Sequence, residues 1–219
     1  MSEYIERNEI ISGLKNELSD LGFVFEPELP GHFIYKPNED VLIWFALNLN
    51  TKTTKEWISS LYISFLKVEN TLIRVGSLPS IDISYIKDRK VPRGTISFKD
   101  TIYNHLTGYN VVSIESLNIF IVNVKRYLVD YGLPFYEKYS SLQDVLGTMD
   151  DLHANGKLWN EIIEGGPDFL FKGLIISKLC RDKNFEGKKV YVKKLITEQL
   201  KDQRWIEAYD RMTVFLSEL

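Results

Sequence analysis

The sequence predicts an α+β fold, in which an N-terminal helix and an antiparallel sheet pack against a C-terminal helical bundle. The spacing of apolar residues changes from a helical period to an alternating one near residue 22 and returns to the helical period near residue 113. No segment of helical length separates the alternating runs, so the strands should pair mostly antiparallel. We therefore expect a helix-and-sheet half over 1–110 and an all-helical half over 111–219, sharing one core.

The first half opens with an apolar stripe over residues 4–21, which predicts an amphipathic helix ended by Gly22. Short runs of β-branched and aromatic residues, separated by Asn, Asp, Gly and Pro, then predict strands. In the longest run Val41, Ile43, Phe45, Leu47 and Leu49 share one face. Residues 77–110 have weak periodicity and predict a long loop. The expected strands are 23–25, 33–35, 41–50, 57–66, 72–75 (after a turn at Glu69-Asn70), 81–85 and 95–98.

The second half reads as helices. A stripe over 113–131 predicts a long helix that Gly132 and Pro134 end. A capping box at Ser140–Gln143 begins the next helix, which Asn155-Gly156 ends. Pro167 stands at a first helical position, and the following residues 169–180 are apolar on nearly every side, which is typical of a central helix. Two further helices are expected over 189–201 and 204–218.

Composition excludes several classes of protein. The chain has 219 residues, a formal net charge of −3 and a hydrophobic content of 44%, as in an ordinary globular protein. The single Cys180 excludes a disulfide framework and Cys-rich zinc sites. No apolar run reaches the roughly 20 residues that span a bilayer, and the first residues lack the pattern of a secretory signal. We therefore expect a cytoplasmic protein without membrane association.

The residues that catalysis would need are not assembled in any recognisable motif. Nucleotide-binding glycine loops and a nucleophile elbow are absent from the sequence. Asp150 and His153 share a helix face and could join a divalent metal site, but a paired His and Asp at an exposed helix end is the favoured interpretation. Cys180 lies on an apolar helix and is interpreted as a buried structural thiol. The sequence thus predicts no metal, no cofactor and no catalytic residue, and leans against an enzyme without deciding the question.

Aromatic residues make up 13% of the chain, and many lie in the predicted sheet. Tyr and Trp among small polar residues are typical of an interaction surface. The competing interpretation, weighed about equally, is that helices cover both sheet faces. The predicted partner-binding residues are Trp44, Trp57, Tyr62 and Tyr85.

A cluster of lysines on the helix expected over 188–201 gives an alternative site. Lys188, Lys189, Lys193 and Lys194 could bind a phosphate-bearing or nucleic-acid ligand. The same helix has an apolar stripe, however, so these lysines are also its expected solvated side. That second interpretation is favoured, and a nucleic-acid partner is not expected.

Several motifs occur here in a fixed order: the leading helix, Leu21-Gly22-Phe23, Phe33-Ile34-Tyr35-Lys36, Ile43-Trp44-Phe45, Leu47-Asn48-Leu49 and the hinge segment Tyr131–Tyr139. This order of parts resembles an uncharacterised bacterial family of unknown function, akin to polymorphic-toxin immunity proteins. These motifs are structural, so the resemblance implies an intracellular bacterial binding role and no catalytic residue.

The sequence therefore predicts a non-enzymatic cytoplasmic protein of bacterial type that binds a protein partner, with an immunity-like or regulatory role. The alternative is an enzyme or binder of a phosphate-bearing or nucleic-acid ligand, with the lysines of 188–201 as the binding residues and His105 or His153 moving a proton. A purely structural component of a larger assembly is a third interpretation.

Overall fold

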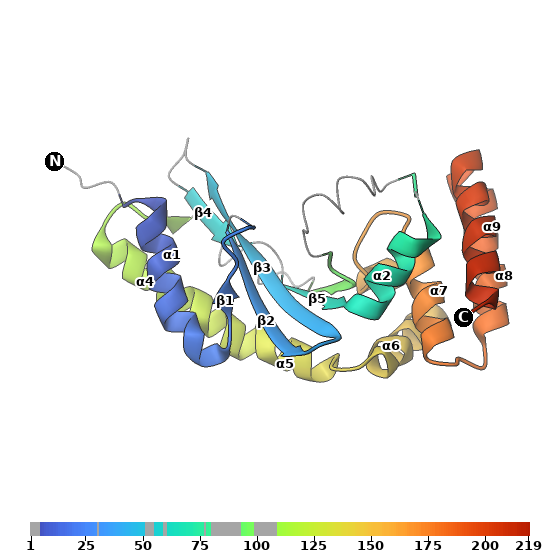
Figure 1. Cartoon of the computed structure of the whole chain (residues 1–219), viewed down its shortest axis with the longest axis horizontal. Coiled ribbons are helices and arrows are strands. Elements are labelled where there is room, and N and C mark those ends of the chain that lie inside the picture. Colours follow the sequence, from blue (N-terminus) through green and yellow to red (C-terminus); the bar gives the residue numbers. More distant parts are fainter. Residues whose placement is uncertain are drawn as a thin grey trace. The chain divides into compact units, whose positions relative to one another are not determined.

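The computed structural model confirms the α+β fold (Figure 1). The chain forms two compact units, one made of residues 1–63 and 97–138 (unit 1) and the other of residues 64–96 and 139–219 (unit 2). The structure describes residues 5–29, 31–50, 55–58, 61–76, 78–79, 93–98 and 109–219.

Unit 1 begins with the predicted helix. Helix α1 (Arg7–Leu18) continues as a 3₁₀ turn over Ser19–Leu21. Gly22 follows with φ at +81°, in the left-handed region that favours glycine, and so confirms the predicted end of the helix. Ile10, Leu14 and Leu18 are buried along one side of α1, at helical spacing.

The sheet of unit 1 is antiparallel with the order β1-β2-β3-β4-β7. Val41, Ile43, Phe45 and Leu47 are buried on one face of β3, which confirms the predicted alternation. The ring of Phe33 stacks on that of Phe45 at a centroid distance of 5.2 Å, across the β2–β3 pair. The run predicted as one strand over 57–66 is two strands, β4 and β5, and β5 pairs with β3 and β6. The strands are β1 (Val24–Phe25), β2 (His32–Asn38), β3 (Val41–Asn50), β4 (Lys55–Ile58), β5 (Tyr62–Phe65), β6 (Ile96–Ser97) and β7 (Tyr109–Asn110).

Helix α4 (Ile114–Tyr127) packs beside α1 (Figure 1). Leu117, Phe120 and Val124 are buried, and Lys125 Nζ lies 2.7 Å from a carboxylate oxygen of Glu17 on α1. Helix α4 thus belongs to the same compact unit as the sheet.

The predicted stop at Gly132 and Pro134 is wrong. The chain continues from α4 through a π-helical turn over Leu128–Gly132 into α5 (Leu133–Lys138). In the π turn the Leu133 N–H donates to the Leu128 carbonyl, five residues back. Pro134 has no N–H to donate to a carbonyl of the preceding helical turn. We attribute the continuity to the wider π turn, in which the hydrogen bonds span five residues and the missing bond is accommodated.

Unit 2 is helical, and α7 lies at its centre, as predicted. Helix α7 contacts α2, α6, α8 and α9, and its residues Phe169 to Ser177 are all buried. The predicted strand over 72–75 is wrong, because these residues belong to α2. The helices are α2 (Leu66–Val75), α6 (Leu142–Ala154), α7 (Phe169–Leu179), α8 (Phe185–Leu195, continued by a π turn over Ile196–Leu200) and α9 (Gln203–Ser217).

Two details of the helix ends differ by a residue or two from the prediction. The capping box of α6 is formed by Ser141 and Asp144, one residue later than expected. Pro167 precedes the N-cap residue Asp168 and so lies outside α7. The end of α6 is as predicted, with Asn155 as C-cap and Gly156 at a φ of +69°.

The close approach of α7 to Trp159 gives a test of packing in unit 2. A Cβ atom at Gly173 would overlap the buried Trp159 ring, whereas a Cβ at Gly147 on α6 would meet open space. We expect Gly173→Ala to lower the free energy of unfolding by about 1–3 kcal/mol through overpacking. The matched control Gly147→Ala should raise it by about 0.4–1 kcal/mol. Urea unfolding measures both values, and equal effects of the two substitutions would contradict this packing.

Candidate functional site

Unit 2 contains a set of charged and polar side chains that are all buried except the partly exposed Arg93, called here the Glu69 cluster: Glu69, Arg93, Thr95, Asp168 and Lys172. Lys172 Nζ donates to the Gly94 carbonyl at 2.6 Å and lies 3.3 Å from Glu69 Oε1. The Thr95 hydroxyl donates to the same oxygen at 2.8 Å. The cluster therefore joins α2, the segment 93–96 and α7.

Arg93 links the two carboxylates of the cluster. Its Nη2 donates to Asp168 Oδ2 at 3.1 Å, and its Nε lies 3.4 Å from Glu69 Oε2. Burial raises the pKa of the Glu69 carboxyl, while Lys172, Thr95 and Arg93 act in the opposite direction. A buried acid beside a lysine is a combination that catalysis also uses. Here both side chains are at most 5% exposed, and their ion pair holds α2 against α7.

The predicted anion-binding lysines do not form one surface. Lys188 is 1% exposed, and its ammonium pairs with Asp182 at 2.7 Å and also with Asp150. The expectation that Lys188 is solvated is therefore wrong, because this face of α8 packs against acidic groups of unit 2. Lys189 pairs with Glu186 at 2.9 Å, whereas Lys193 and Lys194 are exposed.

The other candidates for chemistry are engaged in packing. Burial and the nearby Asp182 raise the pKa of the Cys180 thiol, which is half-buried, whereas the sequence predicts a buried structural thiol. The His153 ring packs edge-on against Tyr191 at 4.5 Å. Among the described residues no group of three His, Cys, Asp or Glu side chains could hold a metal ion. His105 lies outside the part of the chain that the structure describes.

The structure describes the side chains of only two of the four predicted partner-binding residues. The Trp44 ring is 8% exposed and stacks on Tyr62 with a centroid distance of 4.3 Å. Little of Trp44 is thus accessible, although Tyr62 is half-buried. Trp57 lies in β4, where the structure describes the backbone alone, and Tyr85 lies outside the described residues. Their role in partner binding stays a prediction.

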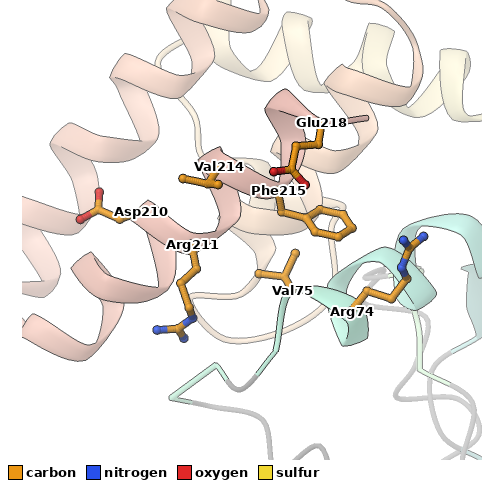
Figure 2. Close-up of a pocket in the computed structure, with 7 residues that line it drawn as sticks. All are labelled: Arg74, Val75, Asp210, Arg211, Val214, Phe215 and Glu218. Atoms are coloured by element: carbon orange, nitrogen blue, oxygen red, sulfur yellow. The ribbon is translucent and has the colours of Figure 1, made fainter.

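An open concave site lies between α2 and α9 of unit 2 (Figure 2). This site, called the α2–α9 groove, has a cavity volume of about 450 Å³. Val75, Val214 and Phe215 form its apolar centre, and the charged residues surround them. Its lining residues are Arg74, Val75, Asp210, Arg211, Val214, Phe215 and Glu218.

The helical period of α2 and α9 determines which of their residues line the groove. On α2 Val68 and Leu72 are buried in the interior, whereas Arg74 and the 8% exposed Val75, at the end of the helix, lie at the groove. On α9 Met212 and Leu216 are buried, so Val214 and Phe215 lie toward its outer side. The Arg74 guanidinium lies 5.2 Å from the Phe215 ring centroid and so covers one face of the ring. Val214 is 62% exposed.

A scan against protein-family models, a search of curated proteins and a search of solved structures each found no match to this chain. In the described part of the chain no helix is both long enough and apolar enough to cross a membrane.

The Glu69 cluster gives a double-mutant test. Lys172→Met leaves a buried carboxylate without its nearest cation, and Glu69→Gln leaves a buried ammonium, so each should lower the free energy of unfolding by about 3–5 kcal/mol. The double variant should lose clearly less than the sum of the two losses. Lys157→Met removes an exposed ion pair with Glu161 and should change stability by less than about 1 kcal/mol. Additive effects in urea unfolding would exclude the coupling.

The same cluster predicts a pH dependence. Because the Glu69 pKa is raised in the folded state, folding binds a proton, and the resulting stability is present below about pH 4.5 and lost as pH rises through the folded-state pKa. Lys172 lowers that pKa, so Lys172→Met should lose stability more steeply with rising pH than the wild type. Urea unfolding at a series of pH values measures the slope, and adding Glu69→Gln should remove the difference between the two proteins.

Proposed function

We propose that this chain is a non-enzymatic protein-binding protein and that the α2–α9 groove receives a segment of its partner. The observation that carries the proposal is an open apolar centre, Val75, Val214 and Phe215, inside a charged border. Binding energy at protein interfaces concentrates at such centres, and a polar border excludes water from them.

The border specifies the chemistry of the partner segment. Arg74 and Arg211 bring positive charge to the groove, and Asp210 and Glu218 bring negative charge. A segment with one large apolar side chain between residues of both signs complements this arrangement. A phosphate-bearing or nucleic-acid ligand would meet two carboxylates there, so the groove favours a protein over a polyanion.

The buried ionisable groups and the single thiol support the remaining parts of the proposal. The ionisable groups that unit 2 brings together, those of the Glu69 cluster and of Lys188, are bonded to one another in its interior, which supports binding over catalysis. The single thiol, Cys180, fits a reducing compartment, which supports a cytoplasmic location, and the bacterial source is proposed from the resemblance alone. An immunity-like or regulatory role fits a groove that captures one segment of another protein.

The test selects segments from a phage-displayed library of random linear peptides on the immobilised full chain. We expect the selected peptides to share one large apolar residue flanked by charged residues of both signs. Val214→Asp should weaken a selected peptide by at least about tenfold, because it places a charge at the apolar centre. The matched control is Val190→Asp on α8, where Val190 is 71% exposed and lies outside the groove.

Retained affinity in Val190→Asp together with loss in Val214→Asp supports the proposal. Selection of no peptide, equal binding by the two variants, or copurification of the chain with nucleic acid in place of protein would overturn it. Circular dichroism of both variants verifies that each substitution leaves the helices formed.

A further inference from the structure

Helix α4 has a second row of side chains, opposite to its packed face. The row follows the alternating spacing of three and four residues that defines the seam of a coiled coil. The members within α4, from Glu115 to Arg126, fall within an arc of about 60° at about 100° per residue, while Val112 precedes the helix and Val129 lies in the π turn that continues it. They are exposed, and the four valine or isoleucine side chains among them range from 44% to 50% exposed. This outer seam consists of Val112, Glu115, Ile119, Val122, Arg126 and Val129.

The outer seam is its own complement when a second copy lies antiparallel to it. A two-fold axis between Ile119 and Val122 places each of these residues opposite the other in the second copy. The same axis brings Glu115 opposite Arg126, while Val112 and Val129 add exposed apolar side chains at the two ends of the row. Within the helix each apolar residue of the row therefore meets an apolar residue, and each charge meets its opposite.

We propose that the chain forms a two-fold symmetric dimer in which the outer seams of two copies pack as an antiparallel helix pair. The occupant of this face is a second copy because the charge pattern requires a partner with the reverse order of Arg and Glu, which the chain itself supplies. In the described part of the chain neither Glu115 nor Arg126 has an ion-pair partner. The pairing in the dimer provides one for both.

The small contact area of the two seams indicates a weak dimer. One helix face on each copy lies below the area of standard protein interfaces, about 1,200–2,000 Å² in total. We therefore expect a reversible dimer with a dissociation constant on the order of 10–100 μM. Sedimentation velocity of the full chain at concentrations on both sides of this value measures the equilibrium.

Charge reversal tests the register. Glu115→Arg creates two Arg–Arg contacts across the axis, and Arg126→Glu creates two Glu–Glu contacts, so each should weaken the dimer by at least about tenfold. The two variants mixed in equal amounts should associate again, because every contact between them then joins opposite charges. The double variant Glu115→Arg/Arg126→Glu should dimerise like the wild type for the same reason. Matched controls are Glu137→Arg on α5 and Lys193→Glu on α8, both exposed and outside the seam.

Loss of the dimer in both single variants, with recovery in the mixture and in the double variant, supports the proposal. Recovery also shows that the single variants fold. A wild-type chain that stays monomeric at the highest concentration, a dimer that persists in both single variants, or a mixture that stays monomeric would overturn it. Loss of the dimer in the two controls to the same degree would also overturn the assigned face.

Discussion

The carboxylate of Glu69 is the constraint on which the arrangement of unit 2 depends. A buried charge is costly unless other groups replace the hydrogen bonds it made to water. In this protein the replacements come from the segment 93–95 and from α7, so α2, which carries Glu69, is held against both. Since α2 provides one side of the α2–α9 groove, the position of Arg74 and Val75 follows from the solvation of a carboxylate several residues earlier in the same helix.

The sequence predicts most elements of this fold because their period is visible in the apolar residues. The helix before Gly22, the buried face of β3 and the central α7 are confirmed for that reason. Helix α2 is missed because Leu72-Ile73-Arg74-Val75 also resembles a short β-branched strand. Its helical spacing emerges only from Val68, Leu72 and Val75 together, which are buried on one side of the helix.

The candidate site could not be predicted from sequence, for two physical reasons. Its residues come from 74–75 and 210–218, and no local pattern tells that these segments meet. Charge alone also misleads, since Lys188 resembles its exposed neighbours in the sequence but is buried between Asp150 and Asp182. One signal was available for the Glu69 cluster: Lys172 lies within the central apolar helix, and a lysine is almost never fully buried without a partner.

The symmetry of a surface limits which partner it can accept. Two identical molecules related by a two-fold axis bring the same surface into contact from both sides. A surface that associates with itself in this way must therefore be complementary to its own rotated copy. The outer seam of α4 meets this condition in both its apolar and its charged positions. The α2–α9 groove does not meet it, because the groove is concave and two concave surfaces cannot fill each other. A concave site requires a partner that projects into it. The two surfaces therefore suit different partners, a second copy for the seam and another protein for the groove.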